Sequence, residues 1–135
     1  MTIEYIIIRG CSGSGKSTYA KKHFPTFQHY EADMFFMKDG QYLFDASQLS
    51  RAHNWCQNAV KSALSEGLSV VCSNTFTTPR EIRPYESISK ELNIPMKVIR
   101  LCQQFKDIHN VPEAILEAQK KRFTDWPGEL MLENY

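Results

Sequence analysis

The sequence has few cysteines and no close pairs of them. Among its 135 residues, the thiols are Cys11, Cys56, Cys72 and Cys102, and wide intervals separate them. Zinc sites and dithiol redox motifs need cysteines or histidines only a few residues apart, and the 4 histidines are equally dispersed. The spacing therefore argues against a structural metal site and predicts reduced thiols.

Long apolar runs are also missing. A membrane-spanning helix needs roughly 20 consecutive apolar residues, and no segment of the chain approaches that length. The start of the chain lacks the basic flank and the cleavage site of a signal peptide. From these absences we expect a cytoplasmic protein with no membrane partner.

Net charge is almost absent. Lys and Arg number 16 and Asp and Glu number 15, which leaves a formal charge of +1. A nucleic-acid partner would therefore need a local basic patch rather than a global field. The apolar share of 42% is typical of a globular protein, and the length predicts a single domain over residues 1–135. The sequence does not indicate an oligomeric state.

The chain alternates short apolar strands with helices. Strands are predicted at residues 1–9, 27–30, 68–72 and 96–101, and helices at 16–24, 47–66, 78–92 and 112–123. Thr78 and Glu81 form a capping-box pattern, with Pro79 at the first helical position of the third helix. Such alternation favours an α/β fold, a three-layer α/β/α domain with a mostly parallel sheet.

A glycine-rich segment follows the first predicted strand. It reads Gly10-Cys11-Ser12-Gly13-Ser14-Gly15-Lys16-Ser17, and Thr18 continues into the helix. This is the full P-loop pattern between a strand and a helix, so the expected fold is of the P-loop NTPase type. Its backbone N–H groups and the helix N-terminus would hold phosphate. We expect ATP and Mg²⁺ as ligands, with Lys16 reaching the β- and γ-phosphates and the Ser17 hydroxyl binding the metal.

Asp33 is the acidic residue expected near the transferred phosphate. In a parallel sheet, Gly10, Asp33 and Ser73 would emerge at the same edge. A kinase needs a carboxylate there to accept a hydroxyl proton or to hold the metal, whereas a turn or a helix cap favours Asp for local reasons alone. P-loop proteins usually present a second carboxylate after a neighbouring strand, but here Cys72 leads into Ser73 and Asn74. Asp33 is therefore predicted to serve as both base and metal ligand.

Basic residues close the last predicted helix and are candidates to contact the transferred phosphoryl group. They are Lys120, Lys121 and Arg122, of which Arg122 is the preferred catalytic residue. The alternative is a solvated cluster that complements the helix dipole. In the long helix, His53 and Trp55 are candidates to contact an acceptor base, although core packing is favoured for Trp55.

Further motifs follow the P-loop. They are Glu31-Ala32-Asp33-Met34-Phe35-Phe36, Gly40-Gln41-Tyr42-Leu43-Phe44-Asp45, Ala52-His53-Asn54-Trp55, Asn74-Thr75, Pro84-Tyr85 and Ile108-His109-Asn110-Val111-Pro112. With them nearly the whole chain resembles an AAA-type ATP-binding group, the small P-loop kinase domains related to phage polynucleotide kinase and to the kinase domain of Nedd4-binding proteins. The resemblance implies that Asp33 deprotonates an acceptor 5′-hydroxyl and that Lys16 and Ser17 bind the nucleotide.

The acceptor side departs from that family at three points. Phe36 stands where the phage enzyme has an acceptor-binding arginine, Ser73 where relatives often have aspartate, and Lys106 where a short lid, residues 103–110, usually has arginine. We expect an ATP-dependent kinase acting on a nucleic-acid 5′-hydroxyl, with a nucleoside or sugar kinase as the alternative. A nucleotide-binding protein without phosphoryl transfer also stays open, but the N-K-x-D motif of a GTPase is absent.

Overall fold

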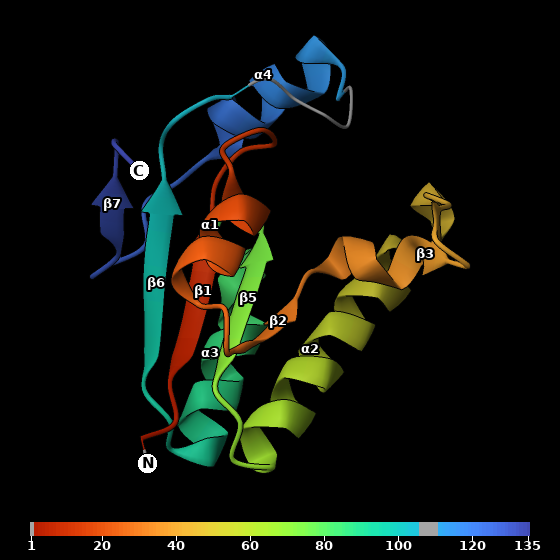
Figure 1. Cartoon of the computed structure of the whole chain (residues 1–135). Coiled ribbons are helices and arrows are strands. Elements are labelled where there is room, and N and C mark those ends of the chain that lie inside the picture. The colour runs from red at the N-terminus through yellow and green to blue at the C-terminus, as the bar shows by residue number, and fades with distance from the viewer. Residues whose placement is uncertain (1, 106–110) are drawn as a thin grey trace.

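The computed structural model describes residues 2–105 and 111–135 of the chain, so Lys106 and the rest of residues 106–110 lie outside the described part. A five-stranded sheet occupies its centre (Figure 1). The strands are β1 (Tyr5–Arg9), β2 (Gln28–Tyr30), β5 (Val70–Asn74), β6 (Met96–Leu101) and β7 (Leu130–Leu132), in the spatial order β2-β5-β1-β6-β7. All neighbouring strands of this sheet run parallel.

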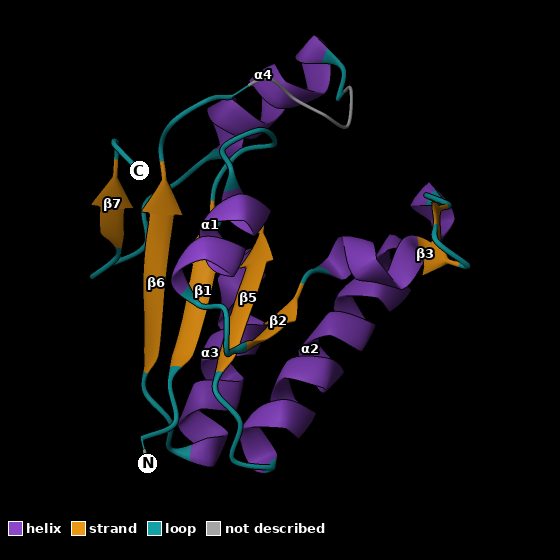
Figure 2. Ribbon diagram, viewed as in Figure 1, coloured by secondary structure: helices purple, strands orange, loops and turns teal. Residues whose placement is uncertain are grey.

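Helices cover both faces of the sheet, as Figure 2 shows. They are α1 (Lys16–His23), α2 (Leu49–Ser65), α3 (Pro79–Leu92) and α4 (Glu113–Arg122). Helix α1 packs on one face and α2 and α3 pack on the other, while α4 lies beyond the end toward which the strands point. The predicted three-layer α/β/α fold with a parallel sheet is confirmed. No helix within the described residues is long and apolar enough to cross a membrane.

The central strand β1 is buried over its whole length. Successive side chains of a strand point to opposite faces, and Ile7 accordingly joins the core under α2 and α3, whereas Ile6 and Ile8 join the core under α1. In a strand that is buried on both faces, no position faces water, so polar residues do not alternate with apolar ones. This burial explains the continuous apolar run that ends at the P-loop.

Two elements were not predicted. Strand β7 extends the sheet beside β6, and a separate antiparallel hairpin joins β3 (Met37–Lys38) to β4 (Gln41–Tyr42). They contain only 3 and 2 residues per strand, too few for an alternating pattern to be recognised. The long helix also starts later than predicted, at Leu49, because residues 46–48 form a short 3-10 helix (η2, Ala46–Gln48).

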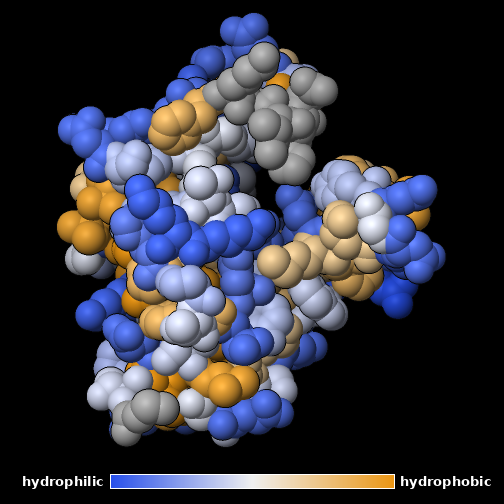
Figure 3. Space-filling model, in the orientation of Figure 1, coloured by the Kyte–Doolittle hydropathy of each residue, from blue (hydrophilic) through white to orange (hydrophobic). Residues whose placement is uncertain are grey.

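The hairpin belongs to an arm that projects from the sheet between β2 and α2 (Figure 1). We define this arm as residues 32–48, which comprise the 3-10 helix η1 (Ala32–Phe36), the hairpin and η2. Phe36 anchors the arm in the main core with only 4% of its surface exposed. Figure 3 shows a hollow between the arm and the body of the molecule. The arm therefore forms one wall of a space next to the carboxyl edge of β2.

A fully buried arginine connects β1 to the end of the chain. The Arg9 guanidinium donates to the Phe76 and Thr124 carbonyls, pairs with the Glu129 carboxylate at 2.9 Å, and lies 4.3 Å from the centre of the Phe123 ring. Each of the three guanidinium nitrogens thus donates to an acceptor, as expected for a buried charge. Because Arg9 immediately precedes Gly10, this cluster also supports the base of the P-loop.

Candidate functional site

The P-loop connects β1 to α1 at the carboxyl edge of the sheet. Gly13 and Gly15 have φ values of +83° and +86°, a region that side chains other than glycine rarely adopt. A Cβ on Gly10 would lie 2.4 Å from the Ser14 hydroxyl oxygen, and a Cβ on Gly13 would lie 2.4 Å from the Gln104 side-chain nitrogen. The loop therefore needs glycine for conformation and for space.

A lysine ammonium and a glutamine side chain contact the loop. The Lys16 ammonium donates to the Cys11 carbonyl at 3.0 Å, so its charge lies against the loop. Ser12 donates its backbone N–H to the Gln119 side-chain oxygen at 2.9 Å and accepts a hydrogen bond from the Gln119 side-chain nitrogen at 3.0 Å. Gln119 lies on α4 and is 8% exposed. Helix α4 is thus docked onto the P-loop through a residue that the sequence patterns did not indicate.

Next to the P-loop, the Glu31 carboxylate contacts three side chains that can donate hydrogen bonds. The Ser17 hydroxyl donates to the Glu31 carboxylate oxygen Oε2, the Ser73 hydroxyl donates to the same oxygen at 2.8 Å, and His29 Nε2 lies 2.9 Å from it. Ser17 lies in the first turn of α1, Glu31 follows β2, and Ser73 lies near the end of β5. The strand order puts these ends together, because β5 lies between β2 and β1.

The environment keeps Glu31 ionised. Burial on its own would raise the pKa of this carboxyl, but the hydrogen bonds from His29, Ser17 and Ser73 outweigh burial and lower the pKa to about 2. Its side chain is 19% exposed. The site therefore contains a fixed negative charge beside the hydroxyl that was predicted to bind the metal. In the sequence, Glu31 stands out only as part of a motif, and no role is predicted for it.

Asp33 lies on the arm, two residues further along, and is exposed. The Tyr42 hydroxyl donates to its Oδ1 at 3.3 Å. The Asn74 side-chain oxygen accepts the Ala32 N–H at 2.9 Å and so links this segment to the end of β5. Asp33 thus contacts Tyr42 of the arm, whereas Glu31 contacts the Ser17 hydroxyl.

Arg122 is exposed at the end of α4, one helical turn after the Gln119 that contacts the P-loop. Lys120 and Lys121 are exposed as well, and Lys120 pairs with Glu117 at 3.6 Å on the same helix. Of the predicted site residues, Lys16 and Ser17 lie at the start of α1 next to the loop, whereas Asp33 is exposed on the arm and Arg122 is exposed on α4.

Aromatic side chains gather on and beside the arm. Trp55, for which core packing was favoured, is 36% exposed, and its ring meets those of Tyr30 and Phe35 with centroids 6.3 and 6.4 Å apart. Tyr42 and Phe44 of the arm are 47% and 50% exposed and stack on each other at 6.4 Å. His53 is exposed on the same helix as Trp55. The wall that carries Asp33 is therefore rich in accessible aromatic surface.

The two thiols Cys56 and Cys72 meet in the core behind this site, with their sulfur atoms 3.6 Å apart. They come from α2 and β5 and are fully buried, so their wide spacing in the sequence concealed the contact. Burial and the neighbouring thiol raise the pKa of Cys72. Cys11, Cys56, Cys72 and Cys102 are all free cysteines in this structure.

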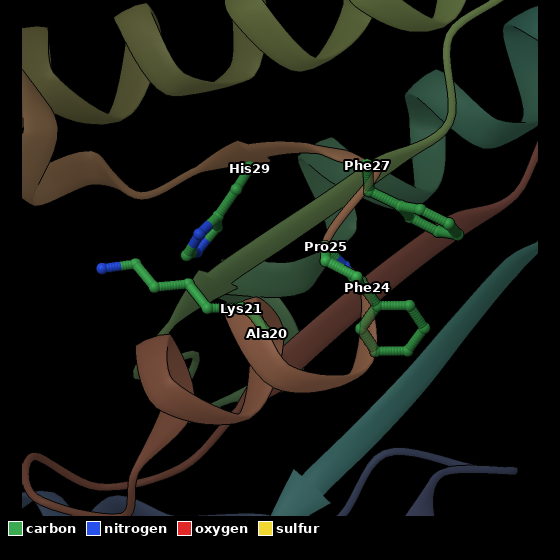
Figure 4. Close-up of a pocket in the computed structure, with 6 residues that line it drawn as sticks. All are labelled: Ala20, Lys21, Phe24, Pro25, Phe27 and His29. Carbon is green, nitrogen blue, oxygen red and sulfur yellow. The ribbon is translucent and has the colours of Figure 1, made fainter.

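A small pocket lies between α1 and the segment that leads into β2, and no P-loop residue lines it. Figure 4 shows its lining, in which Lys21 and His29 point to one side and the rings of Phe24 and Phe27 lie at the other. Its volume is about 190 Å³. His29 connects this pocket to the Glu31 cluster, because its Nε2 contacts both Glu31 and the Ser73 hydroxyl.

Comparisons with known proteins fit this geometry. Residues 6–104 match the family model described as AAA domain. Human NEDD4-binding protein 2 is 34% identical over 90 residues, which make up 64% of this chain and 5% of the human protein. The chain thus spans only a small part of that relative.

Solved structures share the fold at low sequence identity. A chain of the Pnkp1/Rnl/Hen1 RNA repair complex has a TM-score of 0.72 at 17% identity, over 90% of this chain and 44% of that one. The APS kinase of Mycobacterium tuberculosis, in complex with AMPPNP and APS, has a TM-score of 0.66 at 11% identity, over 98% of this chain and 89% of that one. Identities this low establish the common fold and no more.

Proposed function

This chain belongs to the AAA domain family, and we propose that it is an ATP-dependent kinase that transfers the γ-phosphoryl group to an acceptor hydroxyl. The family match and the human relative confirm its predicted resemblance to the small P-loop kinase domains. The observation that carries the proposal is the P-loop, with Lys16 and Ser17 in place, beside an ionised and half-buried carboxylate. Such a site suits a nucleoside triphosphate with its metal.

Nucleotide binding is assigned to the loop and the start of α1. The backbone N–H groups of residues 10–18 would bind the phosphates, and Lys16 would neutralise charge between the β- and γ-phosphates. The hard oxygen donors at Ser17 and the neighbouring carboxylate fit Mg²⁺, which prefers oxygen ligands. Bound Mg²⁺ would offset the negative charge of the phosphates. The likeness in fold to an APS kinase solved with AMPPNP supports this assignment.

Asp33 is proposed as the general base. The acceptor oxygen forms a bond to the γ-phosphorus, the bond from that phosphorus to the β–γ bridging oxygen breaks, and ADP leaves. The acceptor proton passes to the Asp33 carboxylate. The exposure of Asp33 supports this role, because a base must meet the acceptor as it arrives. Arg122 is proposed to stabilise the charge on the transferred group.

The acceptor proposed first is the 5′-hydroxyl end of a nucleic acid. Exposed aromatic surface near the base supports it, because nucleobases stack on such rings for about 1–3 kcal/mol each. Substitution of Trp55 by leucine is expected to raise the KM for an oligonucleotide at least about fivefold and to leave the KM for ATP unchanged. A parallel rise in both Michaelis constants would contradict stacking on Trp55.

The alternative acceptor is a small metabolite such as a nucleoside or a sugar. The net charge of +1 favours it, because a long polyanion is bound more tightly by a strongly basic surface. The likeness in fold to a kinase of a small molecule, APS, also supports it.

Labelled phosphoryl transfer distinguishes these proposals. The protein is incubated with γ-³²P-ATP and Mg²⁺, together with 5′-hydroxyl oligonucleotides, the same oligonucleotides carrying a 5′-phosphate, or a panel of nucleosides and sugars. Label on the 5′-hydroxyl oligonucleotide alone supports the nucleic-acid acceptor, and label on a metabolite alone replaces it. Binding of ATP without label on any acceptor would count against a kinase.

A further inference from the structure

The end of β5 provides no acidic side chain next to the Ser17 hydroxyl, which is proposed to bind the metal. Ser73 and Asn74 are the last two residues of this strand, and neither carries charge. A hydroxyl or an amide contributes no negative charge to a divalent cation, whereas P-loop enzymes bind the metal with a carboxylate as well as the P-loop hydroxyl. A charge must therefore come from another strand if this site holds Mg²⁺.

Glu31 supplies a carboxylate at that place from β2. Its Oε2 accepts the Ser17 hydroxyl, and the Ser73 hydroxyl donates to the same oxygen at 2.8 Å. One oxygen atom is thus shared by the hydroxyls of Ser17 and Ser73. The longer glutamate side chain spans the distance from β2, the edge strand, across the end of β5 toward α1.

Serine at position 73 is compatible with this arrangement, and aspartate is not. A carboxylate at position 73 would place a second negative charge within about 3 Å of Glu31, and two carboxylates sharing such a site repel each other. The serine hydroxyl instead donates a hydrogen bond and fixes the Glu31 rotamer. Glu31 and Ser73 therefore work as a complementary pair.

We propose that Glu31, and not Asp33, is the carboxylate that holds the divalent cation together with the Ser17 hydroxyl. The inference rests on the proposed function, since it assumes that a metal-nucleotide complex binds the P-loop. It separates two roles that the sequence analysis had combined in Asp33. Glu31 serves the donor side through the metal, and Asp33, exposed and bonded to Tyr42, is left for the acceptor.

The test measures binding and not turnover. The affinity for AMPPNP is determined by calorimetry with Mg²⁺ and with EDTA, for the wild-type protein and for Glu31→Gln, which keeps the side-chain shape. In the wild type, Mg²⁺ is expected to tighten AMPPNP binding about tenfold or more, a typical coupling between two ligands. In Glu31→Gln this enhancement should fall to about twofold or less, while the affinity in EDTA stays within about twofold of wild type. The EDTA value also shows that the variant is folded.

Two further variants sharpen the result. Asp33→Asn removes a neighbouring carboxylate by the same chemical change and should retain the full Mg²⁺ enhancement. The double variant Glu31→Gln with Ser73→Asp returns a single carboxylate to the end of β5 and should recover at least part of the enhancement.

The inference is overturned if Glu31→Gln retains the enhancement, if Asp33→Asn loses it, or if the wild type shows none. These outcomes differ from a failure of the proposed function, which would appear as no AMPPNP binding by the wild type under either condition.

Discussion

At the scale of single residues, the carboxylates of Glu31 and Asp33 differ in burial and in hydrogen-bond partners. Glu31 is half-buried and accepts hydrogen bonds from residues of α1 and β5, whereas Asp33 is exposed on the arm and contacts Tyr42 of the hairpin. A group that holds a metal benefits from fixed geometry and a stable charge. A group that takes a proton from an incoming hydroxyl must be accessible.

Replacing Asp33 by asparagine tests its role as base. Transfer should fall by about a hundredfold or more, because general base catalysis contributes about 10²–10⁴-fold. The affinity for ATP should not change, since Glu31 is the carboxylate that contacts the Ser17 hydroxyl. Rapid-quench measurement of a single turnover, with ATP affinity as the control, checks this. Turnover at the wild-type rate would remove Asp33 from the reaction.

Glu31 also predicts how stability depends on pH. Its pKa drops from an ordinary 4.5 to about 2 in the folded protein, so the folded state binds fewer protons than the unfolded state between these values. The stabilisation is complete above pH 4.5 and is lost as the pH falls toward 2. It amounts to roughly 3 kcal/mol, at about 1.36 kcal/mol per pKa unit.

Urea unfolding of the wild type and of Glu31→Gln at a series of pH values measures this contribution. The difference in unfolding free energy between the two proteins should be constant near neutrality and should shrink through the acid range below pH 4.5. A difference that stays unchanged down to pH 2 would mean that the carboxylate is not stabilised by its neighbours.

At the scale of elements, the hairpin depends on a two-residue turn. Asp39 and Gly40 have φ values of +50° and +77°, and both lie between the two strands. Two left-handed residues in succession form the turn that matches the twist of a tight hairpin, and Asp-Gly is a preferred sequence for it. The turn presents Tyr42, whose hydroxyl contacts Asp33, so it links local backbone conformation to the acceptor side of the site.

Gly40→Ala is expected to weaken the acceptor site selectively. A side chain at this φ costs about 1 kcal/mol of backbone strain, and a Cβ at Gly40 meets nothing within 4 Å, so sterics add nothing. The KM for the acceptor should rise and the KM for ATP should stay constant. Gly67→Ala is the matched control, because Gly67 has a φ of +85° and equally open surroundings but follows α2 far along the chain from the hairpin. Equal effects of both variants on acceptor KM would refute a specific role of the turn.

At the scale of the whole molecule, residues 129–135 stabilise the P-loop through contacts with Arg9 and Ser14. Glu129, just before β7, is 5% exposed and pairs with both Arg9 and Arg100. The Tyr135 hydroxyl donates to the Ser14 carbonyl at 2.6 Å and accepts the Gln103 N–H at 2.9 Å. Residues more than 100 positions apart in the sequence thus meet at the loop. This packing explains why β7 forms although its residues have little intrinsic signal.

Removing the charge of Glu129 should therefore destabilise the protein strongly. Glu129→Gln leaves Arg9 buried without its counter-charge, and breaking a buried pair typically costs about 3–5 kcal/mol. Asp125→Asn is the control, because Asp125 is 86% exposed and pairs only with Arg100 among the contacts described, so its loss should cost less than about 1 kcal/mol. Chemical unfolding of both variants measures the difference. Similar losses would show that burial of the Arg9 pair is not decisive.

The sequence alone was sufficient for the parts of this protein that depend on neighbouring residues. The apolar run before Gly10, the glycines and Lys16 specify the P-loop, and the capping box of Thr78 and Glu81 marks the start of α3, where the Thr78 N–H donates to Glu81 at 2.9 Å. The Asp39-Gly40 pair is a further local signal, because Asp-Gly is a preferred sequence for a tight hairpin turn.

Only the tertiary structure decided which side chains meet at the site. Ser17 and Glu31 are 14 residues apart, and Ser73 and Glu31 are 42 apart, so no local pattern relates them. They come together because parallel strands in the order β2-β5-β1 end at one edge, where the long Glu31 side chain reaches over its neighbour. Local preferences determine helices, turns and the phosphate loop, whereas strand order and side-chain reach determine which carboxylate lies beside the P-loop hydroxyl.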